Sequence, residues 1–229
     1  MNNSIVAIVP ASGIGHRASN EQNDIPKQYK KIAGIPILRH TVTKLLLDSR
    51  ISHVNVIIKQ DDCFAEQILD NLNKVNIIKC GGKRRIDTVY NAINLINLNK
   101  NDWIIIHDAV RPGFSINCLT KFIDQCLYDK VGGILAIPVI DTIKKGSIRV
   151  HHTINRDDLW LIQTPQMFRF GLLKKALSIA IQNNLPDITD EASAIEYIGH
   201  NPLIIKGSIS NFKITWPEDF ALMEKLYGF

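Results

Sequence analysis

The chain has 229 residues, of which 45% are hydrophobic and 21% charged, a balance typical of a globular protein with a full core. Its net charge of +5 favours anionic ligands, but its basic residues form short clusters, which argues against a nucleic-acid-binding protein. No apolar run approaches the length of a membrane span, and the start of the chain lacks the basic region of a signal peptide. The four cysteines show no metal-binding spacing and indicate reduced thiols. We therefore expect a cytoplasmic protein that binds neither nucleic acid nor membrane.

Short β-branched runs alternate along the chain with stretches that have the three-to-four-residue apolar spacing of helices. The first predicted strands are Ile5–Val9, Val54–Lys59, Asn76–Lys79, Trp103–His107 and Gly133–Val139. The predicted helices between them are Ile37–Leu47, Phe64–Leu72, Thr88–Ile96 and Asn117–Tyr128. Nearly continuous apolar strands separated by helices predict an α/β fold, a mostly parallel sheet with helices on both faces. We expect one domain over residues 1–229.

Residues 140–163 interrupt this alternation. Thr142–Val150 is typical of a hairpin around Gly146, and a further extended run reaches Gln163. The excursion is too small to own a core, so it is either an exposed flap or a dimer arm. We favour an arm that forms a homodimer, because an unpaired hairpin needs a partner surface.

The remainder of the chain returns to mixed elements. The predicted elements are a helix at Phe170–Gln182, a helix opening at Asp190, strands at Leu203–Ile205 and Phe212–Thr215, and a helix from Pro217. Lys213 points away from its apolar neighbours on the predicted strand. It is solvent-exposed unless that side of the strand faces the ligand-binding crevice.

The loop after the first strand carries the first functional signal. Small residues from Ala11 to Gly15 let the backbone approach a phosphate closely, and Arg17 and Lys27 add positive charge. The stretch Gly13–Ala18 also matches the G-x-G-x-x-A dinucleotide fingerprint. However, no long helix follows it and no acidic residue ends the next strand, so a nicotinamide or flavin site is not expected. The loop predicts a triphosphate site.

A second signal follows the apolar strand that ends near His107. Asp108 stands at the carboxyl end of a predicted central strand, where open α/β sheets bind ligands. A carboxylate beside phosphates is a typical Mg²⁺ ligand, although an ion pair between Asp108 and Arg111 that stabilises the loop remains an alternative. His107 is interpreted as structural. Gly81 and Gly82 precede another helix and permit close approach of a nucleotide, whereas Thr189 or Asp190 is first expected to cap a helix.

Taken together and in order, these segments resemble the cytidylyltransferase family. The matching stretches are 10–17, 26–29, 81–85, 107–112, 138–142, 155–156, 164–166, 189–193 and 211–215. Within the family, the resemblance is closest to the branch that acts on 2-C-methyl-D-erythritol 4-phosphate in the non-mevalonate route to isoprenoid precursors. It implies a Rossmann-like nucleotidyltransferase sheet with a dimerising β-arm. It also implies transfer of CMP from CTP to a polyol phosphate by in-line attack, with release of pyrophosphate and without a covalent intermediate.

The resemblance also implies roles for individual residues. The transition-state stabilisers would be Arg17 and Lys27, and Asp108 would bind the nucleotide through Mg²⁺. Arg156 and Lys213 would position the attacking phosphate, with Arg156 acting from the same or the neighbouring chain. The other substrate-side residues would be Arg111, Thr142, Thr164 and Thr189. The cytidine and triphosphate cradle would comprise Ala11, Ser12, Gly13, Gly82, Arg85 and Thr88.

Three positions depart from the family pattern. Ser12 replaces an alanine, Lys83 stands where an acidic residue is common, and Trp216 replaces a polar residue. Two alternatives remain. One is a cytidylyltransferase for ribitol 5-phosphate, which the stretch 190–193 disfavours. The other is a catalytically inactive nucleotide-binding regulator, which the retention of the catalytic set disfavours.

Overall fold

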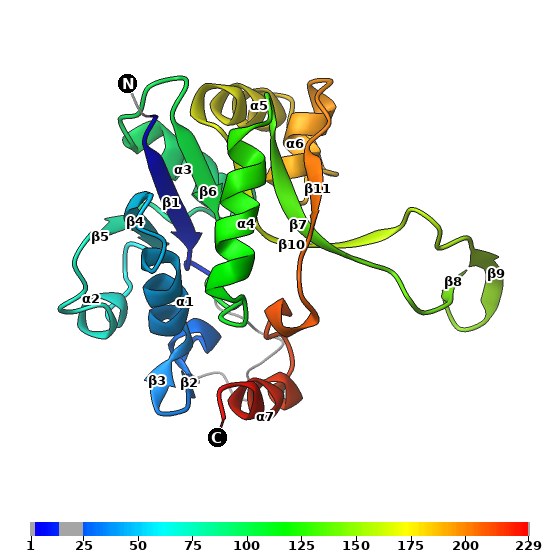
Figure 1. Ribbon diagram of the computed structural model, residues 1–229, viewed down its shortest axis with the longest axis horizontal. Coiled ribbons are helices and arrows are strands. Elements are labelled where there is room, and N and C mark those ends of the chain that lie inside the picture. Colours follow the sequence, from blue (N-terminus) through cyan, green and yellow to red (C-terminus); the bar gives the residue numbers. More distant parts are fainter. Residues whose placement is uncertain (1–2, 14–24, 229) are drawn as a thin grey trace.

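The computed structural model describes residues 3–13 and 25–228. These residues form a seven-stranded sheet with helices on both faces and an arm that projects from one side (Figure 1). In spatial order the strands are β11 (Leu203–Lys206), β7 (Gly132–Pro138), β10 (Trp160–Arg169), β6 (Trp103–Ile106), β1 (Ile5–Pro10), β4 (Ile51–Ile58) and β5 (Val75–Lys79). The α/β prediction is confirmed.

The sheet is parallel except at one strand. β1 pairs in parallel with β4 on one side and with β6 on the other, whereas β10 runs antiparallel to both β6 and β7. Because the chain leaves β1 for β4 and reaches β6 on the opposite side, the strand order reverses beside β1. Open α/β sheets bind ligands at such a reversal, outside the carboxyl ends of the strands.

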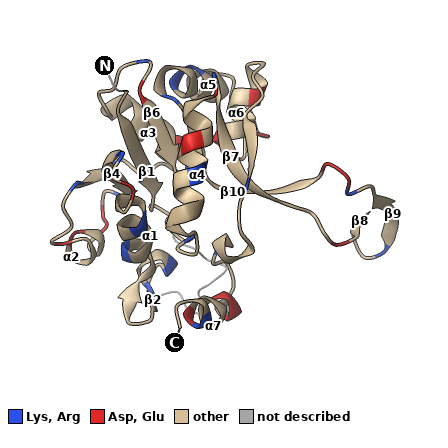
Figure 2. Cartoon of the chain, in the orientation of Figure 1, with Lys and Arg blue, Asp and Glu red and all other residues tan. Residues whose placement is uncertain are grey.

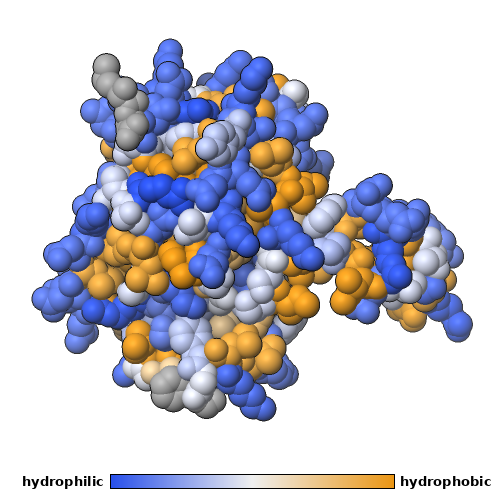
Figure 3. All heavy atoms as spheres, in the orientation of Figure 1, coloured by the Kyte–Doolittle hydropathy of each residue, from blue (hydrophilic) through white to orange (hydrophobic). Residues whose placement is uncertain are grey.

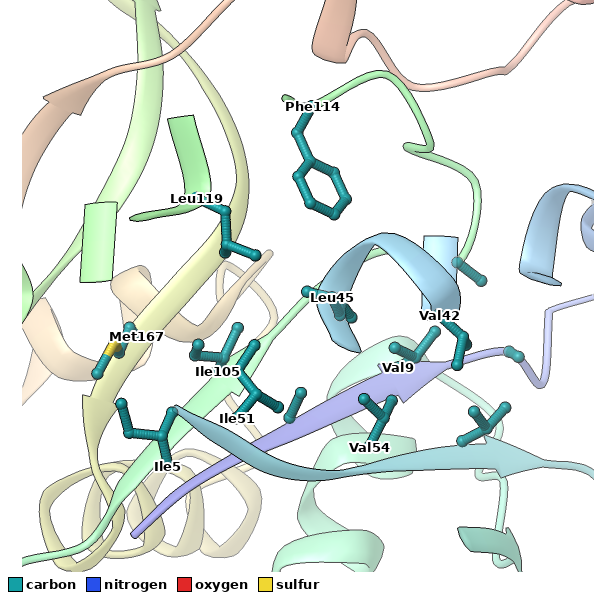
Figure 4. Close-up of a cluster of buried hydrophobic side chains, with 14 of the residues drawn as sticks. Ile5, Val9, Val42, Leu45, Ile51, Val54, Ile105, Phe114, Leu119 and Met167 are labelled. Atoms are coloured by element: carbon teal, nitrogen blue, oxygen red, sulfur yellow. The ribbon is translucent and has the colours of Figure 1, made fainter. Parts of the chain in front are cut away.

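The helices cover both faces of the sheet, so the central strands are apolar almost throughout. The helices are α1 (Ile37–Leu46), α2 (Ala65–Ile68), α3 (Arg85–Leu95), α4 (Ile116–Leu127), α5 (Phe170–Gln182), α6 (Glu191–Tyr197) and α7 (Pro217–Leu226). Ile5 and Val9 of β1 join the core beneath α1 and α4, including Val42, Leu45 and Leu119 (Figure 4). Ile8 belongs to the core on the opposite face, beneath α3, α5 and α6. Each such buried aliphatic side chain contributes about 1.5–3 kcal/mol.

The C-terminal helix begins as the sequence predicts. Pro217 occupies its first turn, and the Asp219 carboxylate accepts the backbone N–H groups of Thr215 at 2.7 Å and Trp216 at 2.8 Å. Met223 anchors α7 in a small core that also contains Val110 and Ile214. This packing ties the end of the chain to the loop that follows β6.

The predicted hairpin is also present. β8 (Ile143–Gly146) pairs antiparallel with β9 (Val150–Ile154), and the pair stands at the end of an arm continuous with β7 and β10 (Figure 1). The arm carries both acidic and basic residues (Figure 2). Apolar side chains are exposed on it, among them Ile148, which is 99% exposed (Figure 3).

Three sequence predictions need correction. Phe212–Thr215 is not a strand: it follows a 3-10 turn at Ile209–Asn211 and contacts the loop after β6 through the Ile214 N–H and the Val110 carbonyl. The predicted helix Phe64–Leu72 is shorter, because Asn71 has a left-handed backbone with φ of 61°. The extended run to Gln163 continues to Arg169 as an interior strand of the sheet.

Within the described residues, no helix is both long enough and apolar enough to cross a membrane.

Substitution of Gly132 tests how closely the backbones of β7 and β10 pack. Its φ is +117°, and a Cβ atom there would lie 2.0 Å from the Met167 carbonyl oxygen. We expect Gly132→Ala to lower the free energy of unfolding by about 3 kcal/mol or more, because a strained backbone and a clash with main chain add together. Urea denaturation measures the change.

Gly199→Ala is the matched control. Gly199 also has a positive φ, of +84°, but no atom lies within 4 Å of the added Cβ. The free energy of unfolding of Gly199→Ala should fall by only about 1 kcal/mol, the cost of the backbone conformation alone. Equal losses in the two variants would contradict the clash at Gly132.

Candidate active site

Loops at the carboxyl ends of β1, β4, β5 and β6 line a cavity of about 810 Å³. The loops meet because β6, β1, β4 and β5 are consecutive neighbours in the sheet. Eight of the predicted site residues line the cavity: Ala11, Ser12, Gly13, Lys27, Gly82, Arg85, Asp108 and Lys213. The structure therefore brings together most of the residues that were predicted to bind the nucleotide.

The loop after β1 is held from behind by Gln28. The buried Gln28 amide donates through Nε2 to the Ala11 carbonyl at 2.8 Å and to the Gly13 carbonyl at 3.0 Å. Both N–H bonds of that amide are thus used to fix the course of the loop. Gln28 was not predicted as a site residue, although its place between Lys27 and Tyr29, inside one of the family-like stretches, was a signal.

The loop after β5 packs directly on the first loop. A Cβ atom at Gly81 would lie 2.4 Å from the Ser12 Cβ, so only glycine permits this approach. The Thr88 hydroxyl lies 2.9 Å from the Ser12 hydroxyl and accepts the Gly82 N–H at 3.0 Å. Ser12, a departure from the family pattern, therefore joins the two loops through a hydrogen bond that alanine cannot make.

Asp108 lies on the cavity wall and faces three cations. Its Oδ1 accepts from Arg85 Nε at 3.0 Å, and its Oδ2 from Arg111 Nε at 3.2 Å and Lys213 Nζ at 3.1 Å. Burial alone would raise the pKa of the Asp108 carboxyl, but the cations outweigh burial and hold that pKa well below its usual range. The ion pair with Arg111, considered as an alternative in the sequence, is present.

Arg85 serves a second carboxylate. Its Nη1 donates to both oxygens of Glu191 at 2.8 and 2.9 Å, and the Glu191 side chain is only 1% exposed. Burial raises the pKa of Glu191, and Arg85 opposes that rise. Glu191 was not predicted as a site residue, because an acid in the first turn of a helix is usually explained by the helix dipole.

His107 is structural, as expected. It is fully buried, lies edge-on to Phe114, and its Nε2 is 3.0 Å from the Arg111 carbonyl. Burial lowers its pKa to about 4, so the ring is neutral at physiological pH.

The segment that carries Lys213 reaches the cavity through buried hydrogen bonds. Asn211 donates from Nδ2 to the Thr164 carbonyl at 2.8 Å, and its own carbonyl accepts from Arg111 at 2.9 Å. Lys27 donates from Nζ to the Ile214 carbonyl at 3.0 Å. These contacts join Lys27 to the segment that carries Lys213.

The other predicted residues are distributed as follows. The Thr164 hydroxyl accepts the Asp108 N–H at 3.0 Å. Thr189 directly precedes the helix cap Asp190, whose capping role is confirmed. Thr142 and Arg156 belong to the arm, where Arg156 bonds the Ile140 carbonyl, and neither lines the cavity. Arg17 lies outside the described residues.

The residues around the cavity can be compared with those that a Mg²⁺ site requires. Among the described residues, no group of three or more His, Cys, Asp or Glu side chains has the geometry of a metal site. A single carboxylate on the wall of a cation-lined cavity nevertheless fits Mg²⁺, which commonly takes one or two protein carboxylates and completes its shell with substrate phosphates. Asp108 is the residue that fits this role.

Glycine-rich loops at a sheet reversal, with cations around a buried carboxylate, define a nucleotide-binding α/β enzyme site. The family model of 2-C-methyl-D-erythritol 4-phosphate cytidylyltransferase (IspD) matches residues 5–227. The enzyme of that name from Bordetella parapertussis is 51% identical over 98% of this chain and 99% of its own. The chain belongs to this family.

Solved structures agree with that assignment. A crystal structure of a 4-diphosphocytidyl-2C-methyl-D-erythritol synthase superposes with a TM-score of 0.87 at 32% identity, over 99% of both chains. The Francisella tularensis 2-C-methyl-D-erythritol 4-phosphate cytidylyltransferase gives 0.83 at 35% identity, over 97% of this chain and 99% of that one.

Gln28→Glu tests the support of the first loop. The change puts a carboxylate oxygen where the amide now donates to two carbonyls, so the loop must move. We expect CTP affinity, measured by calorimetry, to fall about tenfold or more.

The control is Gln60→Glu, which adds the same charge at an exposed position lining the same cavity. If both variants lose affinity equally, the added charge, and not the lost hydrogen bonds of Gln28, explains the loss.

Proposed function

We propose that this protein transfers the cytidylyl group of CTP to 2-C-methyl-D-erythritol 4-phosphate, giving 4-diphosphocytidyl-2-C-methyl-D-erythritol and pyrophosphate in the non-mevalonate pathway. The observation that carries the proposal is the set of basic side chains around Asp108 in the cavity, beside two loops whose backbones lie open to a nucleotide. Family membership supplies the identity of both substrates.

The nucleotide occupies the loop side of the cavity in this proposal. The loop Ala11–Gly13 cradles the triphosphate with the backbone N–H groups of Ser12 and Gly13, since the Ala11 N–H bonds the Ile57 carbonyl at 2.8 Å, while Gly82 and Thr88 flank the cytidine. The hydrogen bond between Ser12 and Thr88 supports this assignment, since it holds the two loops at a fixed separation.

The reaction needs no nucleophile from the protein. An oxygen of the acceptor phosphate attacks the α-phosphorus of CTP in line. The new O–P bond forms as the bond to the β-phosphate breaks, and pyrophosphate leaves with the electron pair. Negative charge builds on the α-phosphoryl oxygens and the leaving group, so fixed cations lower the barrier. Lys27 supplies one of them, and Arg17 is proposed to supply another.

Asp108 would hold Mg²⁺ together with phosphate oxygens of CTP. The metal, when bound, neutralises charge on the triphosphate and the departing pyrophosphate. Arg111 and Lys213, which now lie on Oδ2 of Asp108, are then attracted to the acceptor phosphate. Thr164 and Thr189 complete this side of the site.

Arg156 and Thr142 are proposed to complete the acceptor site of a second copy. Both lie on the projecting arm and outside the cavity of their own chain, and the arm exposes Ile148 and Val150. A homodimer joined through residues 140–163 would bury these apolar groups and carry Arg156 to the neighbouring cavity. The four free thiols favour a cytoplasmic location.

Lys27→Ala tests the transition-state role. Loss of a fixed cation beside the α-phosphate should slow pyrophosphate release from CTP and the methylerythritol phosphate by about a hundredfold or more. Lys31→Ala, which removes an exposed lysine four residues away, should keep wild-type turnover.

The same measurement of pyrophosphate release, with ribitol 5-phosphate as the acceptor, tests the alternative substrate. Faster turnover of ribitol 5-phosphate by the wild-type protein would contradict the proposed substrate. Undiminished turnover by Lys27→Ala would contradict only the role of that lysine.

Arg156→Ala tests whether Arg156 completes the site of its own chain or that of the neighbouring chain. Mixing subunits of inactive Arg156→Ala with inactive Lys27→Ala should restore about a quarter of wild-type activity, because half of the dimers are mixed and each has one intact site. If Arg156 serves its own chain, every site stays defective and the mixture remains inactive.

A further inference from the structure

The Arg85 guanidinium connects three elements of the site through hydrogen bonds. Arg85 is the first residue of α3, Asp108 follows β6, and Glu191 is the first residue of α6. Arg85 Nε bonds Asp108 at 3.0 Å, and Nη1 bonds both oxygens of Glu191 at 2.8 and 2.9 Å. Within the described residues its Nη2 is buried without a hydrogen-bond partner. Arg85 thus has few donors left for a nucleotide phosphate, although the family resemblance assigns it to the nucleotide.

Glu191 is held in place by its neighbours in the chain. The Gln166 amide donates to Asp190 Oδ2 at 2.8 Å, and its oxygen accepts the Ala192 N–H at 2.9 Å. Gln166 is itself buried and pairs with Ile106 in the sheet. Because the residues on both sides of Glu191 are anchored, Arg85 adapts to Glu191 and not the reverse.

The contact with Glu191 then decides which carboxylate oxygen of Asp108 Arg85 can bond. With Nη1 on Glu191, Arg85 reaches only Oδ1 through Nε, which leaves Oδ2 to Lys213 and Arg111. Without the negative charge of Glu191, Asp108 is the remaining carboxylate bonded to Arg85. A guanidinium then favours the side-on geometry that takes both carboxylate oxygens.

We propose that Glu191 is a positioning residue that acts through Arg85: it confines Arg85 to Oδ1 of Asp108 and so keeps this guanidinium off Oδ2, the oxygen that Arg111 and Lys213 contact. The inference rests on the proposed function in one respect, because the group that benefits is the divalent cation assigned to Asp108. Glu191 itself touches neither CTP nor the cation. Its two oxygens are both engaged by Arg85, and its side chain is almost completely enclosed.

The test uses Glu191→Gln, which keeps the shape and removes the charge. CTP binding is measured by calorimetry with Mg²⁺ and with EDTA, and turnover is measured separately by pyrophosphate release. We expect the gain in CTP affinity produced by Mg²⁺ to fall about tenfold, as is typical when a residue supporting a metal ligand is lost. Affinity in EDTA should change by less than about twofold. Glu196→Gln, at an exposed position of the same helix, should match wild type in both.

A double-mutant cycle shows whether Glu191 acts through Arg85. Arg85→Gln alone strands the charge of Glu191, whereas Arg85→Gln/Glu191→Gln removes both charges and is the variant best placed to fold. If the inference is right, the double variant loses no more of the Mg²⁺ effect than the worse single variant. Thermal melts of all variants report folding.

Three results would overturn the inference. One is a lower melting temperature in Glu191→Gln with the wild-type Mg²⁺ effect, which is the signature of a purely structural ion pair. A second is a double variant in which the losses of the Mg²⁺ effect from the two single variants add together. The third is a wild-type protein whose CTP affinity does not change with Mg²⁺. That result also removes the metal role of Asp108, while pyrophosphate release by the wild-type protein still tests cytidylyl transfer.

Discussion

The buried carboxylate of Asp108 is the charge around which the site is arranged. An unpaired carboxylate in this position would cost several kcal/mol, so the fold has to supply cations to it. Arg85, Arg111 and Lys213 come from the start of α3, the loop after β6 and the segment before α7. One electrostatic requirement therefore brings together parts of the chain more than 100 residues apart. It also leaves the cavity with a surplus of positive charge suited to phosphates.

Neutral hydrogen bonds give this charge cluster its shape. Gln28 holds the loop after β1, Gln166 holds the start of α6, and Asn211 holds the segment that leads to Lys213. Each of these amides is buried and bonds main-chain atoms of a distant element, and such buried contacts are costly to break. The charged groups can therefore meet a ligand with little rearrangement, which is the condition for electrostatic catalysis.

Much of this site could be predicted from the sequence. Asp108 was predicted at the ligand-binding edge of the sheet because it follows an apolar strand, and the family resemblance assigned Ala11 and Gly82 to the same nucleotide site. The supporting residues could not be found in this way. Gln28 and Glu191 carry no periodic signal, and their importance lies in which distant atom each one reaches. The alternation of Phe212–Thr215 predicts a strand, but its backbone N–H groups bond the Val110 carbonyl and the Asp219 carboxylate instead of a sheet edge.

The sequence by itself determined the alternation of strands and helices, the projecting hairpin, and the family with its chemistry. These features follow from local spacing and from short motifs, which fold in much the same way wherever they occur. Only the tertiary structure decided that β10 is an interior antiparallel strand, that Ser12 bonds Thr88, and that Arg85 is divided between two carboxylates. The physical reason is that hydrogen bonds and ion pairs between distant segments depend on distances of a few tenths of an ångström. Those distances are set by the packing of the whole sheet and its helices, and no local pattern encodes them.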